Sequence, residues 1–160
     1  MSDSIVSNVG VFGLALVFKV RMPDGVAART DGVDIWVDDR LNEIQEQCAI
    51  AHEEEHIARG HSTLQPEAIE MSVRYAVAKR LLPQDALVDG PVCNPELKSL
   101  AAVAKSLGVT RQVLMDRTVT ATDEQVRANG CLSCFKCPAI AARYEPLYQA
   151  HREQQQLVNA

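Results

Sequence analysis

The first forty residues carry apolar positions in short runs, and a longer helical period follows them. Three apolar segments separated by two turn signals predict strands at 14–20, 26–29 and 33–37, with turns at 22–25 and 31–32. In the last segment Val33, Ile35 and Val37 alternate with Asp34 and Trp36, which is the period of a half-buried strand. The pattern therefore predicts a small antiparallel sheet near the start of the chain.

The helical period begins after this sheet. Asp38 and Asp39 are expected to cap a helix from Arg40 to Arg59 that stops at Gly60. Further helices are predicted at 66–82, 95–107, 111–117, 123–128 and from about 139 onward. The helix at 95–107 is expected to be capped by Asn94, and Thr110 to cap the next one. Residues 95–117 thus resemble a helix–turn–helix pair.

The predicted fold class is α+β, with the small sheet packed on the helix at 40–59 and a mostly helical C-terminal half. Residues 1–128 are expected to form one domain, and residues 129–160 an appendage. With 160 residues and 47% hydrophobic residues, the chain has the composition of an ordinary globular protein.

Charge and hydropathy exclude some classes of function. The formal net charge of −5 argues against a whole-surface attraction to nucleic acid or anionic lipid. The apolar stretch Val9–Phe18 is far shorter than the roughly 20 residues that span a bilayer. No Lys or Arg precedes it, so a secretory signal is not expected and the predicted location is the cytoplasm.

The most informative motif is His52-Glu53-Glu54-Glu55-His56, which fits H-E-x-x-H. Residues four apart on a helix lie one turn above each other, so both imidazoles can reach one cation. The intervening Glu53 is then the candidate general base for a water molecule. The bland alternative is a solvated acidic turn of helix. The position of the two histidines at the border of the predicted buried face favours a zinc site.

A catalytic zinc site needs a third protein ligand. On a helical wheel of residues 66–82, Glu70 and Glu67 fall inside the apolar arc, where a carboxylate is costly unless it is paired or bound to metal. Glu70 is the preferred ligand, and the alternative is an ion pair of Glu70 or Glu67 with Arg74. His61 follows His56 by five residues rather than the six of the long metallopeptidase motif, so it supports a ligand or is simply a loop residue.

These residues resemble the ImmA/IrrE family of zincin-like metallopeptidases, which is common in phages, mobile elements and bacterial regulators. The likeness covers roughly residues 10–125 and is carried by Gly32–Asp38, Ala51-His52-Glu53, His56, Arg59-Gly60-His61, Glu70, Ala76, Ala78, Leu81-Leu82-Pro83 and the segment Leu97–Thr110. The resemblance implies a site-specific endopeptidase that cleaves a transcriptional repressor, with His52, His56 and Glu70 as metal ligands and Glu53 as base.

The sequence departs from this family at Glu54 and Glu55, where apolar or small residues are usual. Glu55 falls beside Ala51 and Ala58 on the wheel, so it is expected to disturb the buried face. The extra carboxylates could instead be exposed, raise the pKa of Glu53 by like-charge proximity, or weaken activity.

A second cluster, Cys131, Cys134 and Cys137, is tight enough for three thiolates to share a metal. Zinc is the more economical choice and an iron–sulfur cluster the other, with Cys93, a histidine or an external group as fourth ligand. Reduced or redox-labile thiols are the alternative.

The leading hypothesis is a zinc-dependent endopeptidase acting on a regulatory protein. The alternative is a non-catalytic regulator stabilised by metal. A DNA-binding module using Arg111 and Arg117 is less favoured, because Asp116 lies between them and the neighbourhood is not strongly basic.

Overall fold

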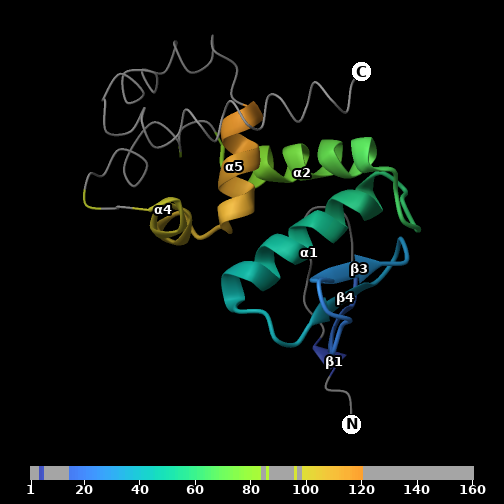
Figure 1. Ribbon diagram of the computed structural model, residues 1–160. Coiled ribbons are helices and arrows are strands. Elements are labelled where there is room, and N and C mark those ends of the chain that lie inside the picture. The colour runs from blue at the N-terminus through green and yellow to red at the C-terminus, as the bar shows by residue number, and fades with distance from the viewer. Residues whose placement is uncertain (1–3, 6–14, 84–85, 87–95, 97–98, 121–160) are drawn as a thin grey trace. The chain divides into compact units, whose positions relative to one another are not determined.

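The computed structural model describes residues 4–5, 15–83, 86, 96 and 99–120 (Figure 1). The chain divides into two compact units, Met1–Val77 and Ala78–Ala160. The predicted domain boundary at residue 128, the helices at 123–128 and beyond 139, and the cysteine cluster lie outside the described residues. No helix in the part that the structure describes is long and apolar enough to cross a membrane.

The first unit contains a four-stranded sheet in the order β1-β2-β4-β3. Its strands are β1 (Ser4–Ile5), β2 (Val17–Val20), β3 (Ala28–Thr30) and β4 (Ile35–Asp38). Strands β1 and β2 pair antiparallel, as do β3 and β4, but β2 and β4 are parallel. The α+β class is therefore confirmed, whereas the prediction of a purely antiparallel sheet is wrong.

The parallel pair arises because the chain reverses direction twice between β2 and β4. The first reversal is the turn in which the Val26 N–H donates to the Pro23 carbonyl, with Gly25 at φ 85°. The second follows β3, where Gly32 has φ 96°. A parallel connection needs about a dozen residues or more, and residues 21–34 supply that length with β3 inside it. Strand β4 therefore inserts between β2 and β3.

One face of this sheet forms the core of the first unit. Val17, Ile35 and Val37 are almost fully buried, and Ile50 and Ile57 of the following helix pack against them. On the other face Phe18 stacks on Trp36, with ring centroids 5.8 Å apart, and the Arg29 guanidinium lies 5.4 Å from the Trp36 ring centroid. The predicted alternation of β4 is thus confirmed. Val33, which is 67% exposed, belongs to the preceding turn.

Helix α1 (Glu43–Ala58) contacts β3 and β4, as Figure 1 shows. Its N-cap is Asn42, whose side chain accepts from the Gln45 N–H while the Gln45 side chain accepts from the Asn42 N–H. The predicted cap at Asp38 and Asp39 is wrong. Asp38 instead accepts hydrogen bonds from the Arg40 guanidinium at 2.7–3.0 Å, which holds the pKa of Asp38 down at about 2.

Helix α2 (Glu67–Leu81) begins after the loop that follows α1, and its residues up to Val77 belong to the first unit. In the second unit, α4 (Leu100–Ser106) and α5 (Arg111–Thr120) contact each other. Ser99 caps α4, so the helix starts later than predicted, and residues 94 and 95 lie outside the described ranges. Thr110 caps α5 as expected by accepting from the Val113 N–H.

Candidate metal centre

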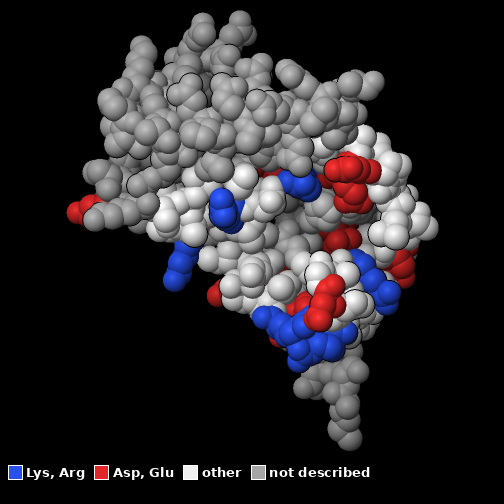
Figure 2. Space-filling view, viewed as in Figure 1, with Lys and Arg blue, Asp and Glu red and all other residues white. Residues whose placement is uncertain are grey.

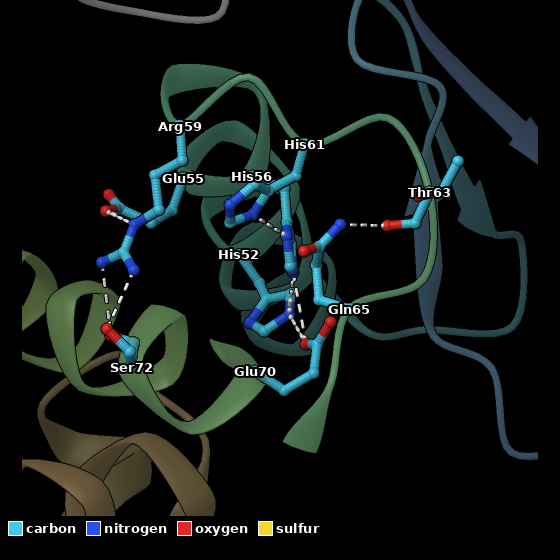
Figure 3. A network of polar contacts seen from close by, with 9 residues as sticks. All are labelled: His52, Glu55, His56, Arg59, His61, Thr63, Gln65, Glu70 and Ser72. Atoms are coloured by element: carbon cyan, nitrogen blue, oxygen red, sulfur yellow. Dashed lines mark hydrogen bonds and ion pairs between the residues drawn. The ribbon is translucent and has the colours of Figure 1, made fainter. Parts of the chain in front are cut away.

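Three side chains of the first unit bring one ligand atom each to a common point (Figure 3). The Nε2 atoms of His52 and His56 are 3.0 Å apart. The Glu70 Oε2 lies 3.2 Å from the His56 Nε2 and 3.3 Å from the His52 Nε2. The two histidines and the glutamate predicted as metal ligands therefore converge, and the group could hold a metal ion.

The elements that carry these residues explain the convergence. His52 and His56 are four residues apart on α1, so their rings lie on one side of the helix with centroids 4.8 Å apart. Glu70 lies in the first turn of α2, where its N–H donates to the Pro66 carbonyl. The loop between the helices brings the first turn of α2 back to α1. Of the two glutamates on the predicted apolar arc, Glu70 is half-buried and Glu67 is exposed, which supports the choice of Glu70.

The separations of the ligand atoms fit a tetrahedral zinc ion. Zinc binds histidine nitrogen and carboxylate oxygen at about 2.0–2.2 Å, so two ligands of a regular tetrahedron lie about 3.3–3.6 Å apart. The three observed separations of 3.0, 3.2 and 3.3 Å are close to that edge.

Burial sets the protonation of the residues around this point. His56 is 6% exposed. The burial of His52 and the nearby His56 both lower the pKa of His52, whereas the negative charge of Glu70 raises it. A lowered pKa favours the neutral imidazole, which is the form that binds a metal.

Glu53, the candidate base, is 8% exposed. Its burial, helped by the negative charge of Glu70, raises the pKa of Glu53 to about 7, and a hydrogen bond with the Thr30 backbone opposes this rise. Thr30 belongs to β3, so the sheet as well as α1 surrounds this carboxyl group. The extra glutamates Glu54 and Glu55 are not among the causes of the raised pKa. A carboxyl group with a pKa near 7 suits general base chemistry near neutral pH.

Glu55 does not disturb the buried face as the wheel had suggested. Its Oε1 accepts from the Arg59 Nε at 2.8 Å, one helical turn further along α1. Arg59 also donates through Nη1 to the Ser72 hydroxyl at 2.9 Å and through Nη2 to the Ser72 carbonyl at 3.3 Å. Figure 3 shows this Glu55–Arg59–Ser72 link between α1 and α2, beside the three converging side chains. It ties the helix of His56 to the helix of Glu70.

His61 lies against His56, with the two Nδ1 atoms 3.0 Å apart and the ring centroids 5.2 Å apart. It is not one of the three converging ligands. The sequence left open whether His61 supports a ligand or is a loop residue, and the structure places it in contact with a candidate ligand.

The remaining sequence candidates are the cysteine cluster and the arginines considered for DNA contact. Cys131, Cys134 and Cys137 lie outside the described residues. Arg117, considered for DNA contact, is 5% exposed and its Nε donates to the Leu82 carbonyl at 2.6 Å. It is therefore engaged inside the second unit. Figure 2 shows basic side chains next to acidic ones on the visible face of the described residues.

The sequence argument missed the contacts of Thr30 and Ser72 near the centre and the Asn42 cap at the start of α1. Only the cap had a local signal, because Asn42 and Gln45 have the spacing of a capping box.

Comparisons with protein-family models, with curated proteins and with solved structures found no match.

Proposed function

We propose that this chain is a zinc-dependent endopeptidase that hydrolyses a peptide bond in a regulatory protein. The observation that carries the proposal is the set of three ligand atoms within 3.0–3.3 Å of one another, with Glu53 next in the chain to one ligand. The resemblance to the ImmA/IrrE family supports a transcriptional repressor as the substrate. In this proposal the site lies in the cytoplasm and acts without nucleic acid.

Each residue has a distinct task in the proposed reaction. His52, His56 and Glu70 would hold the zinc ion through Nε2, Nε2 and Oε2. A zinc ion supplies a Lewis acid that polarises a carbonyl group and makes a water molecule more acidic. Glu53 would accept a proton from the attacking water, whose oxygen bonds to the carbonyl carbon, and would pass that proton to the amine that leaves when the C–N bond breaks. In the metal-free chain the pKa of Glu53 is raised to about 7, a range in which a carboxyl group can both take up and release a proton near neutral pH.

Two measurements test the proposal. Metal analysis of the full chain should find zinc that is lost in His52→Ala and in Glu70→Ala but kept in Glu53→Gln. Incubation with the repressor encoded beside this gene should give defined fragments with the wild type and none with Glu53→Gln. If both alanine variants retain zinc, the proposed metal site is wrong. If Glu53→Gln still cleaves the repressor, the proposed role of Glu53 is wrong.

The second candidate function is a regulator in which the metal only stabilises the fold. It is favoured by the fact that the ligands come from two helices, because a metal there would join α1 to α2. The two candidates make opposite predictions for one assay. A protein that binds zinc through His52 and Glu70 but cleaves no repressor would be the structural type.

The predicted cysteine site is kept separate in these experiments. If Cys131, Cys134 and Cys137 bind a second zinc ion or an iron–sulfur cluster, Cys134→Ser loses that metal and keeps the first one.

A further inference from the structure

The end of α1 has a backbone geometry that brings two histidines together. Arg59 is the C-cap, and Gly60 follows with φ 72°, the left-handed conformation that glycine adopts without strain. The Gly60 N–H donates to the Ile57 carbonyl, and the His61 N–H donates to the His56 carbonyl, both at 2.9 Å. This pair of hydrogen bonds is the Schellman motif.

The motif fixes which side chains meet. In a Schellman cap the residue after the glycine contacts the residue four positions before the glycine, and the two are commonly apolar. Here those two positions are His61 and His56. The usual apolar contact is replaced by an approach of the two Nδ1 atoms to 3.0 Å. The C-terminal cap of α1 therefore places the His61 imidazole next to the Nδ1 of His56, on the side of the ring away from the candidate metal position.

The direction of this hydrogen bond follows from the other nitrogen of His56. The Nε2 of His56 faces His52 and Glu70, and it can bind a cation only through its lone pair. A neutral imidazole then carries its proton on Nδ1, so the His56 Nδ1–H donates to the His61 Nδ1. Ligating histidines usually have such an acceptor behind them, which fixes the tautomer and the ring orientation.

We propose that His61 is a positioning residue that orients His56 for metal binding by accepting a hydrogen bond from its Nδ1. The inference rests on the proposed zinc site and adds to it a fourth side chain that does not bind the ion. The role belongs to the acceptor atom of His61, because the backbone bonds of the cap do not depend on the side chain. Replacing that atom should weaken zinc binding without changing the fold.

A matched pair of variants separates the acceptor from the packing of the side chain. Asparagine places its Oδ1 the same number of bonds from the backbone as the histidine Nδ1, so His61→Asn retains an acceptor. Leucine has a similar branched shape and no acceptor, so His61→Leu removes only the hydrogen bond. His61→Phe is a second variant without an acceptor, in case leucine impairs folding. Circular dichroism and urea denaturation of the metal-free chains check the fold.

The readout is the dissociation constant for zinc, measured on the full chain by competition with a chromogenic chelator. We expect His61→Leu and His61→Phe to bind zinc about 10- to 100-fold more weakly than the wild type, and His61→Asn to remain within about threefold. Equal affinities in the leucine and asparagine variants would overturn the positioning role and leave the zinc site intact. A zinc affinity that His52→Ala does not change would instead overturn the site itself, and the role of His61 with it.

Discussion

Glu53→Gln should make the metal-free protein more stable at high pH, although it removes the proposed base. Glu53 is buried, and its pKa is raised from the ordinary 4.5 to about 7. The folded chain therefore holds a proton that the unfolded chain releases between these two values. Because the folded state binds more protons in this range, the free energy of unfolding falls as the pH rises through it. Glutamine does not titrate, so the free energy of unfolding of the variant does not fall in this way.

The size of the effect follows from the displacement of the pKa. A tenfold change in proton affinity is worth about 1.4 kcal/mol, so a rise from 4.5 to about 7 corresponds to about 3 kcal/mol. This contribution is fully present below pH 4.5 and lost above pH 7. The difference in free energy of unfolding, variant minus wild type, should therefore increase by about 3 kcal/mol between pH 4 and pH 8.

Urea denaturation at four pH values measures this difference in the free energy of unfolding. A chelator is present to keep both chains free of metal. The lowered pKa of His52 produces an opposite slope, in which stability rises with pH, but it does so in both chains and cancels in the comparison. Glu43→Gln, at an exposed position in the first turn of the same helix, controls for replacing a glutamate on α1. A difference between Glu53→Gln and wild type that stays constant within about 0.5 kcal/mol from pH 4 to 8 would refute the argument from burial.

Three further predictions use the same denaturation assay. Gly32→Ala should cost about 1 kcal/mol more than Gly25→Ala, because both glycines have positive φ but only a Cβ at Gly32 meets another residue, the Ser62 Cβ at 3.1 Å. Equal costs would mean that the loop at Ser62 moves aside freely. Arg59→Met should lower the free energy of unfolding by about 1–2 kcal/mol, because it removes the hydrogen bonds to Glu55 and Ser72; no loss would show that the link contributes nothing. Zinc at about 100 times its dissociation constant should stabilise the wild type by about 2.7 kcal/mol and leave Glu70→Ala unchanged, and stabilisation of that variant would place the metal elsewhere.

Features that depend on neighbours in the chain could be predicted from the sequence. The spacing of His52 and His56 sets their relative position on any helix, and the position of Glu70 on an apolar arc anticipated its approach to them. The turns at Gly25 and Gly32 and the helix stop at Gly60 followed from residues that tolerate positive φ.

Features that depend on the order of strands, or on which of several nearby residues caps a helix, could not be predicted from the sequence. Nothing local in β4 says that it lies between β2 and β3, so the parallel pair was missed. The sequence argument placed the helix cap at Asp38 and Asp39, but the Asp38 carboxylate accepts a hydrogen bond from the Arg40 guanidinium and Asn42 caps α1. Glu55 was misjudged because a wheel shows only the face of a residue and not the partner that satisfies it.

The candidate metal ligands and the candidate base depend largely on different contacts, although Glu70 affects both. The ligands depend on two helices, and their separation is braced by the link from Arg59 to Ser72 and, on the proposal above, by His61 behind His56. The raised pKa of Glu53 depends instead on burial beside β3, where Thr30 lies, and on the charge of Glu70. If the proposed function holds, a change in β3 should therefore alter the pH dependence of repressor cleavage while leaving zinc affinity nearly unchanged.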